Sequence, residues 1–325
     1  MKSATLREVA SAAGIHLATA SAVLNGSRGS TRVSAATRAA VLAAAQALGY
    51  VRNESASHLR TGLSAAVGFI GGDLRNPFFA ELSAEIEKEL GLRQHQLVIS
   101  HVASDDHASF QNALRVMRGQ ALHSIIYWDE LGDAATPPVS SRTKMLPIGF
   151  TSRPRSGVWL DLEHAIRQSV DYLVSAGYRR LGFFAPALRG ESPSVQARWD
   201  IFHRECGSHG LPEPIRASYA GESWDVEAAI AGARETFRTP ARADAYLSFN
   251  DTAALGLLLA RIPRLKPAVV CFDGTGLVRR WPGHPPYLDL KLRDLARLCV
   301  AVQMGERSAR SLGLRAHWLR PAIIS

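Results

Sequence analysis

Apolar residues recur at helical spacing between residues 5 and 50 of the chain. The motif Thr5-Leu6-Arg7-Glu8 is a capping box, in which the Thr5 hydroxyl accepts from the backbone amide of Glu8 and the Glu8 carboxylate accepts from the amide of Thr5. The motif predicts a helix that begins near Leu6. Gly14, which can adopt a left-handed turn, marks its end.

Two further helices are predicted before residue 50. In the second, which follows Gly14 almost at once, Ala20, Val23 and Leu24 form the inward face. Its outward positions are Leu17, Ala18, Ser21, Ala22 and Asn25. The third begins after the N-cap Ser34 and continues through Ala39, Leu42, Ala45 and Leu48 to Gly49. Short helices around a glycine turn are typical of a helix-turn-helix, although the pattern alone also fits part of any helical bundle.

From Ser64 onward, short apolar runs alternate with stretches of helical periodicity. The predicted strands are 66–70, 96–100, 124–127, 146–150, 180–184, 243–247 and 268–272. Regular alternation implies parallel sheets with helices on both faces, and this many strands indicates two doubly wound halves with a ligand at the carboxyl ends of the strands. The predicted fold class is therefore α/β, with an all-α headpiece and two Rossmann-like subdomains. Enzymes, transport-binding proteins and repressors all use this architecture, so it does not decide between them.

The net charge of +9 favours a polyanionic partner. Residues 1 to 64 hold seven basic side chains against two acidic ones, an excess of five positive charges. The first fifth of the chain therefore carries more than half of the net charge. Such a concentration is expected where a segment contacts nucleic acid.

Motifs for catalysis and metal binding are missing from the sequence. There is no phosphate loop, no HExxH and no nucleophile elbow, so no catalytic residue and no cofactor is predicted. The cysteines Cys206, Cys271 and Cys299 lie far apart and are expected to be reduced and buried. The stretch from His101 to His107, which includes Asp105 and Asp106, could be a metal site, but a polar loop with helix-capping aspartates is the favoured interpretation. No metal is predicted.

No segment has the apolar core of a signal peptide, and none approaches the roughly 18 apolar residues of a membrane span. We therefore expect a soluble, cytoplasmic protein that does not contact a membrane.

Three runs together carry a family resemblance: TLREVASAAGIHLATASAVLNG, then RVSAATRAAVLAAAQALGYVRN, then SASHLRTG. In order and spacing they resemble the DNA-binding headpiece and hinge of the lac repressor (LacI/GalR) family of transcription factors. The resemblance is continuous from Thr5 to Gly62 and extends more loosely to about residue 275. It implies the subdomain architecture of the periplasmic binding proteins for the rest of the chain.

The resemblance implies specific DNA contacts in the headpiece. Thr5 caps the first helix and contacts the DNA backbone, and Leu17, Ala18 and Ala22 read bases. Residues that fix register on the phosphates are Ser21, Asn25, Ser34 and Tyr50. Further DNA-binding positions carried over are Leu6, Thr19, Thr37 and Asn53. Leu59 occupies the position of a leucine that enters the minor groove and kinks the duplex, although it could be an ordinary linker residue.

The chain departs from the family where the bases are read. His16 stands where a Ser cap is usual, and Ala22 stands where Arg is frequent. The apolar side chains of Leu17, Ala18 and Ala22 suit thymine methyl groups, and each missing bidentate arginine removes roughly 1 to 3 kcal/mol of discrimination at one base pair.

The resemblance also implies an effector site. Its predicted residues are Asp73, Phe78, Phe79, Gln196, Arg198, Trp224, Asn250 and Asp273. Asp251 follows Asn250 at a position that also resembles an effector contact. Gln196 aligns with the family's ligand-gripping arginine, and Arg198 lies two positions further on. Without the resemblance, Phe78 and Trp224 would be read as packing residues, and Asn250 and Asp251 as helix caps.

The predicted domains are a helix-turn-helix domain over 1–52, a hinge helix over 53–62 and an effector-binding and dimerisation domain over 63–325. Within the last, one subdomain takes about 63–160 and 289–318, and the other 161–288 and 319–325. The predicted function is a repressor that binds a palindromic DNA operator as a homodimer under the control of a sugar or related metabolite. The alternatives are a soluble sugar-binding protein without a DNA role and an enzyme on the same fold.

Overall fold

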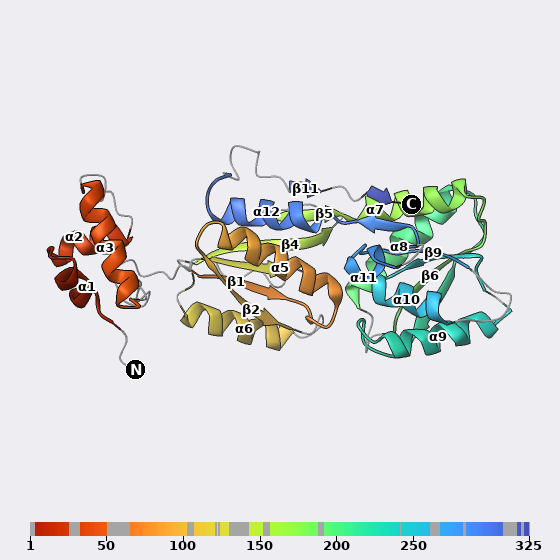
Figure 1. Cartoon of the computed structure of the whole chain (residues 1–325). Coiled ribbons are helices and arrows are strands. Elements are labelled where there is room, and N and C mark those ends of the chain that lie inside the picture. Colours follow the sequence, from red (N-terminus) through yellow and green to blue (C-terminus); the bar gives the residue numbers. More distant parts are fainter. Residues whose placement is uncertain are drawn as a thin grey trace. The chain divides into compact units, whose positions relative to one another are not determined.

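In the computed structural model the chain divides into two compact units, residues 1–64 and 65–325 (Figure 1). The structure describes residues 4–25, 33–50, 66–102, 107–120, 122, 124–129, 143–151, 157–187, 192–240, 242–260, 267–281, 284–307, 317–319 and 322–324. The predicted hinge over 53–62, with Asn53 and Leu59, lies outside these residues. The predicted domain limits stay predictions.

The described part of the first unit contains the helices α1 (Leu6–Ala12), α2 (Leu17–Asn25) and α3 (Ala35–Ala47). The capping box is present, because the Thr5 hydroxyl accepts from the amide of Glu8 at 3.3 Å and the amide of Thr5 donates to the Glu8 carboxylate at 2.6 Å. Ser34 caps α3 by accepting from the amide of Thr37 at 3.1 Å. Gly14, with φ of +65°, makes the left-handed turn that ends the first helix.

A small apolar core joins these three helices. Its buried members are Val9, Val23, Val41 and Ala45. The predicted outward positions Leu17 and Ala18 are exposed. In α3, Leu42 is 52% exposed, whereas the adjacent Val41 is fully buried. The inward pair is Val41 and Ala45, which lie one helical turn apart and face α1 and α2.

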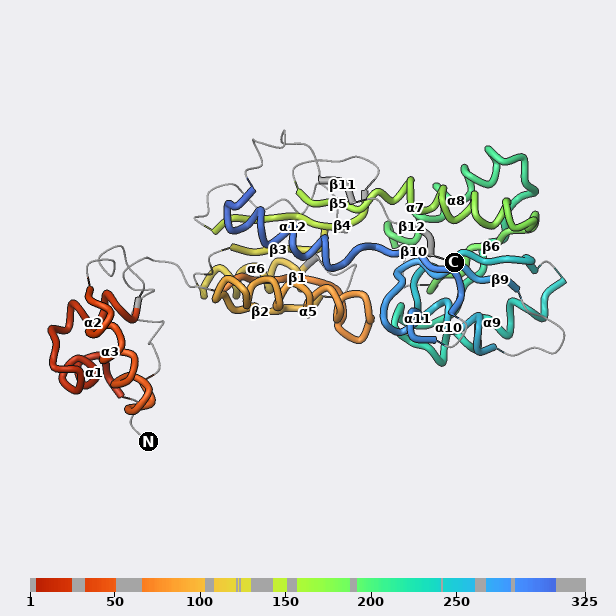
Figure 2. Tube along the Cα trace, turned by 45° about the horizontal axis from the view of Figure 1, so that its top comes forward, coloured from red at the N-terminus to blue at the C-terminus, as the bar shows by residue number. Residues whose placement is uncertain are grey.

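The first lobe of the second unit is built on a parallel sheet in the order β11-β5-β4-β3-β1-β2. Its strands are β1 (Ala66–Gly71), β2 (Gln96–His101), β3 (Ser124–Trp128), β4 (Lys144–Thr151), β5 (Val158–Asp161) and β11 (His317–Leu319). Helices α5 (Pro77–Gly91) and α12 (Leu292–Gln303) pack together over one face, and α6 (His107–Gly119) covers the other (Figures 1 and 2). Alternate residues of β1 serve the two faces, with Phe69 in the core shared with α5 and Ile70 in the cluster shared with α6.

The second lobe is built on a parallel sheet in the order β7-β6-β8-β9. Its strands are β6 (Leu181–Pro186), β7 (Ile215–Tyr219), β8 (Ala245–Ser248) and β9 (Ala268–Val270). Its helices are α7 (Leu162–Ser175), α8 (Pro193–Ser208), α9 (Val226–Arg238), α10 (Asp251–Leu259) and the short α11 (Gly276–Arg279). Figures 1 and 2 show α8 on one side of this sheet and α9 and α10 on the other. The strands β10 (Tyr287–Asp289) and β12 (Ala322–Ile324) form a separate antiparallel pair.

Each predicted strand coincides with an observed one, and the α/β class with two doubly wound halves is confirmed. The strands β5, β7, β10, β11 and β12 were not predicted. In both sheets the chain turns back beside the first strand, with β1 between β2 and β3 and β6 between β7 and β8. Loops that leave the carboxyl ends on either side of such a reversal diverge and leave a crevice for a ligand.

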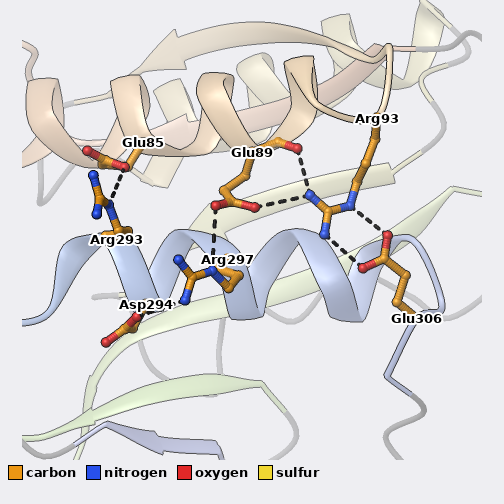
Figure 3. Close-up of polar contacts among 7 residues, drawn as sticks. All are labelled: Glu85, Glu89, Arg93, Arg293, Asp294, Arg297 and Glu306. Atoms are coloured by element: carbon orange, nitrogen blue, oxygen red, sulfur yellow. Dashed lines mark hydrogen bonds and ion pairs between the residues drawn. The ribbon is translucent and has the colours of Figure 1, made fainter.

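Ion pairs attach α12 to α5 (Figure 3). The nearly buried carboxylate of Glu89 lies 3.1 Å from Arg93 Nη1 and 3.6 Å from Arg297 Nε. Arg93 also pairs with Glu306, just beyond α12, at 2.6 Å. Two hydrogen-bonded carboxylates raise the pKa of Arg93 further above its usual range. The segment that returns to the first lobe is therefore held by both packing and charge.

Candidate functional site

A cavity of about 170 Å³ lies between the two lobes, where loops leave the carboxyl ends of the strands. The first lobe lines it with Gly72, Asp73, Arg75, Asn76, Phe78, Phe79, Trp128 and Phe150. The second lobe lines it with Ser192, Ser194, Arg198, Glu222, Ser223, Trp224, Phe249, Asn250 and Asp273. The structure thus brings together all of the predicted effector residues except Gln196, and Asp251, which also resembled an effector contact, is not among the lining residues.

Aromatic rings form one wall of the cavity. Phe78 is only 3% exposed, and its ring centroid lies 5.0 Å from that of Trp128 in an edge-to-face arrangement. Phe150 continues the wall, 5.6 Å from Trp128. Phe78 is therefore both a core residue and a lining residue, since the wall is the edge of the hydrophobic core itself.

Arg198 is the buried cation of the cavity, with 5% of its surface exposed. Its guanidinium carbon lies 4.2 Å from the ring centroid of Phe249 and 4.7 Å from that of Phe272, and Nη1 donates to the Ser194 hydroxyl at 3.1 Å. A guanidinium held over ring faces is stabilised by their negative π-surfaces and keeps a fixed orientation.

Gln196 lies two residues earlier on α8 and is not among the described residues that line the cavity. Residues two apart on a helix do not share a face. Its amide donates to Asp200 at 2.6 Å and accepts from Arg216 at 3.0 Å. The structure therefore places Arg198, and not Gln196, at the cavity.

Two carboxyl groups lie close together at the cavity, that of Asp273 in its lining and that of Asp251 behind it. Asp251 is buried and accepts from the amides of Gly274 at 3.1 Å and Thr275 at 2.6 Å and from the Thr275 hydroxyl at 2.7 Å. Asp251 thus anchors the turn that carries Asp273, while Asp273 itself lines the cavity. Burial, together with the nearby Asp251, raises the pKa of Asp273 well above its ordinary value, and Arg198 opposes this rise.

Asn250 serves as both a helix cap and a lining residue. Its side-chain oxygen accepts from the amide of Ala253 at 2.8 Å, which caps α10. Its amide nitrogen donates to the carbonyl of Ser223 at 2.7 Å. That second bond ties the loop of Trp224 to the start of α10.

Arg75 and Trp224 meet across the lobes. The guanidinium carbon of Arg75 lies 3.6 Å from the centroid of the Trp224 ring. Asp73 holds Arg75 through two side-chain hydrogen bonds to Nε, at 2.9 and 3.0 Å. The hydrogen bond from Arg75 lowers the pKa of Asp73.

A second contact between the lobes joins α5 to α11. The carboxylate of Glu81 accepts from the backbone amide of Gly276 and lies 3.0 Å from Arg279 Nη2. A Cβ atom at position 276 would stand 2.9 Å from the Glu81 carboxylate, so glycine permits the close approach. Arg279 and Arg280 are both exposed, and Arg279 ends the short α11.

Most predicted DNA-binding residues fall within the described part of the first unit. On or beside α1 and α2 they are Thr5, Leu6, Leu17, Ala18, Thr19, Ser21, Ala22 and Asn25, and around α3 they are Ser34, Thr37 and Tyr50. Thr5 and Ser34 act as helix caps. Leu17 and Ala18 lie exposed in the first turn of α2.

Asp105 and Asp106 of the candidate metal cluster lie outside the described residues. Across the ranges that are described, no group of acidic, histidine or cysteine side chains is arranged to hold a metal ion. Within the same ranges no helix has the length and apolar character needed to cross a membrane. The three cysteines are buried and free, as expected.

Several lining residues were not predicted, namely Gly72, Arg75, Asn76, Trp128, Phe150, Ser192, Ser194, Glu222, Ser223 and Phe249. Phe150 ends a predicted strand, and Trp128 and Phe249 lie one and two residues after predicted strands, so their position at the carboxyl ends was the available signal. Arg75 and Glu222 lie in loops, and nothing in the sequence pattern distinguishes them from other exposed charges.

Comparisons with known proteins relate the whole chain to one group of regulators. Residues 5–53 match the model of "Bacterial regulatory proteins, lacI family". The maltose regulon regulatory protein MalI of Escherichia coli K12 is 31% identical over 199 residues, which cover 60% of this chain and 56% of MalI. MalI of Vibrio furnissii is 33% identical over 38% of this chain and 87% of that sequence. The transcriptional regulator GalS of Salmonella typhimurium is 28% identical over 98% of this chain and 95% of GalS.

Among solved structures, the lac repressor dimer bound to operator and the anti-inducer ONPF superposes with a TM-score of 0.82 at 20% identity. The match covers 100% of this chain and 98% of that one. At this identity the likeness establishes a shared fold, from the helical headpiece to the two lobes.

Proposed function

Because this chain belongs to the lacI family of bacterial regulatory proteins, we propose that it represses transcription in the cytoplasm by binding a palindromic operator as a homodimer. A sugar or a related small metabolite in the cavity between the lobes controls this binding. The observation that carries the proposal is a helix-turn-helix unit joined in one chain to a two-lobed unit with a lined cavity. Its relatives are regulators, and an enzymatic role is not supported.

On the DNA side, Leu17, Ala18 and Ala22 are the proposed base readers. Leu17 and Ala18 are exposed at the start of α2, the position from which a recognition helix enters the major groove. Their apolar side chains contact thymine methyl groups, and the basic residues of the unit supply the phosphate contacts. Specificity then depends on methyl contacts and DNA deformability more than on guanine pairing.

On the effector side, the cavity has the composition of a polyol site. Aromatic rings such as Phe78 and Trp128 offer flat apolar faces for a sugar ring. Arg198, Asn250 and Asp273 offer donors and acceptors for its hydroxyls. A sugar-binding protein without a DNA role would share this cavity, but it would have no use for the capped helices of residues 5–50.

Selection of bound sequences from a random duplex pool tests the proposal. The full-length protein should enrich a palindrome, and one or more members of a sugar panel should change the enrichment. A variant without residues 1–60 should lose all specific DNA binding, because it lacks the recognition helix, and should keep its affinity for the sugar. Specific duplex binding by the shortened protein would refute the mechanism.

A further inference from the structure

Arg75 and Trp224 stand between the interior of the cavity and solvent. The side chain of Arg75 is 63% exposed, whereas Phe78, Arg198 and Asp273 are at most 5% exposed. Arg75 comes from the loop after β1 and Trp224 from the loop between β7 and α9, so each lobe contributes one member of the pair. Both residues line the cavity, and this stacked pair, with the exposed side chain of Arg75, is called the Arg75–Trp224 cover below.

The arginine of the cover is held in a single orientation. Asp73 accepts from the backbone amide of Arg75 at 2.9 Å and from its Nε at 2.9 and 3.0 Å. A carboxylate that binds both the backbone and the side chain of the same residue leaves that side chain few rotamers. The hydrogen bond to Asp73 raises the pKa of Arg75 above its usual value, and the charge of Glu222, near Trp224 in the opposite loop, adds to this rise.

The tryptophan of the cover is fixed on both sides as well. The residue before it, Ser223, accepts from the Asn250 side chain at 2.7 Å. The residue after it, Asp225, caps α9 by accepting from the amide of Ala228 at 2.9 Å. The ring of Trp224 is therefore presented by a loop that is anchored to α9 and α10.

The size of the cavity limits the ligand that the site can hold. The cavity of about 170 Å³ is smaller than the roughly 300 to 1,000 Å³ of sites for drug-sized ligands. One face of Trp224 is occupied by the guanidinium of Arg75. Phe78 and Trp128 offer apolar ring surface inside the cavity. On the face of Trp224 that Arg75 covers, a second sugar ring could stack only where the guanidinium now lies.

We infer that Arg75 determines the specificity of the site, because its stacking on Trp224 restricts the effector to a single sugar ring and excludes disaccharides. This inference rests on the proposed function, which assigns a sugar to the cavity. The side chains inside the cavity select the ring and its hydroxyls, and Arg75 limits the length of the ligand.

The test compares the full-length protein with Arg75→Ala and with the control Arg179→Ala. Arg179 is exposed and bonds only to carbonyl groups near the end of α7 in the described structure. Calorimetry with aldopentoses, aldohexoses and disaccharides that contain the same rings measures each dissociation constant. We expect the wild type and Arg179→Ala to bind a monosaccharide and reject its disaccharides. Arg75→Ala should bind a disaccharide at least about tenfold more tightly than the wild type does.

Two results would overturn the inference while leaving the proposed function intact. One is a wild type that binds a disaccharide as tightly as the monosaccharide. The other is an Arg75→Ala protein that binds the monosaccharide and still rejects every disaccharide. If neither protein bound any sugar while both still selected an operator, the sugar assignment would fail, and the inference with it.

Discussion

The most unusual residues of the site are the neighbouring carboxyl groups of Asp251 and Asp273. Both are buried, and burial raises the pKa of each. Asp251 receives hydrogen bonds from several backbone amides and a hydroxyl, which favour its charged form. Asp273 lacks that number of donors in the described structure, so it is the member of the pair that retains a proton.

This assignment predicts a pH-dependent effect of Asp273→Asn. The pKa of Asp273 is higher in the folded chain than in the unfolded chain, so wild-type stability falls as pH rises from about 4 through the folded pKa. The loss has a maximum slope of about 1.4 kcal/mol per pH unit. Since asparagine cannot ionise, Asp273→Asn should gain stability relative to the wild type between acidic and neutral pH.

Urea unfolding followed by tryptophan fluorescence measures this difference. All six tryptophans lie in residues 65–325, so the signal reports that unit alone. Asp244→Asn, at an exposed acidic residue, is the control and should follow the wild type. A stability difference between wild type and Asp273→Asn that stays constant with pH would show that Asp273 is ionised.

At the scale of elements, α5 is organised by acidic residues four positions apart. Glu85 and Glu89 both face α12 (Figure 3). Their contacts differ in strength, since Glu89 is nearly buried between Arg93 and Arg297, whereas Glu85 lies 3.8 Å from Arg293 with more of its side chain exposed. The Glu89 carboxylate is therefore part of the packing between α5 and α12, whereas the Glu85 carboxylate lies at its edge.

Glu89→Gln should destabilise residues 65–325 by about 1 to 3 kcal/mol, because the amide loses a charged hydrogen bond and leaves two arginines without their shared anion. Glu85→Gln, the matched control on the same helix, should cost less than about 1 kcal/mol. Denaturant midpoints of the two variants give the comparison. Equal midpoints would mean that the burial of Glu89 adds nothing to its ion pairs.

The same elements show which parts of the fold could be predicted from the sequence. Strands with continuous apolar runs, such as β1 and β3, were predictable because buried parallel strands have this pattern. β7, with the sequence IRASY, has no continuous apolar run, because it lies at a sheet edge and alternates polar and apolar residues. The strands β10, β11 and β12 are only three residues long. These strands were therefore not predicted. Arg198 faces the cavity and Gln196 does not because of the rotation of α8 about its axis. That rotation depends on the packing of Phe202 and its neighbours. Contacts such as Glu81 with Gly276 join residues 195 positions apart, and no local pattern encodes them.

At the scale of the whole two-lobed unit, Glu81 extends the acidic row of α5 to the opposite lobe. It lies one turn before Glu85, but it binds the amide of Gly276 and Arg279 of α11 instead of α12. Helix α5 is thus bound to α12 of its own lobe and to α11 of the opposite lobe. The Glu81 contact stabilises the arrangement in which the lobes enclose the cavity.

Glu81→Ala should therefore shift the lobes toward a more open arrangement. A ligand that requires the closed arrangement must then supply the missing free energy, so its dissociation constant should rise by roughly 3- to 10-fold. Hydrogen exchange of the segment around Gly276 should become faster, because its amide loses a charged acceptor. Glu87→Ala, at an exposed position on the same helix, is the control. If Glu81→Ala matched Glu87→Ala in exchange rates and in sugar affinity, the Glu81 contact would not govern the closure of the lobes. Operator binding by the two variants would then be the same as well.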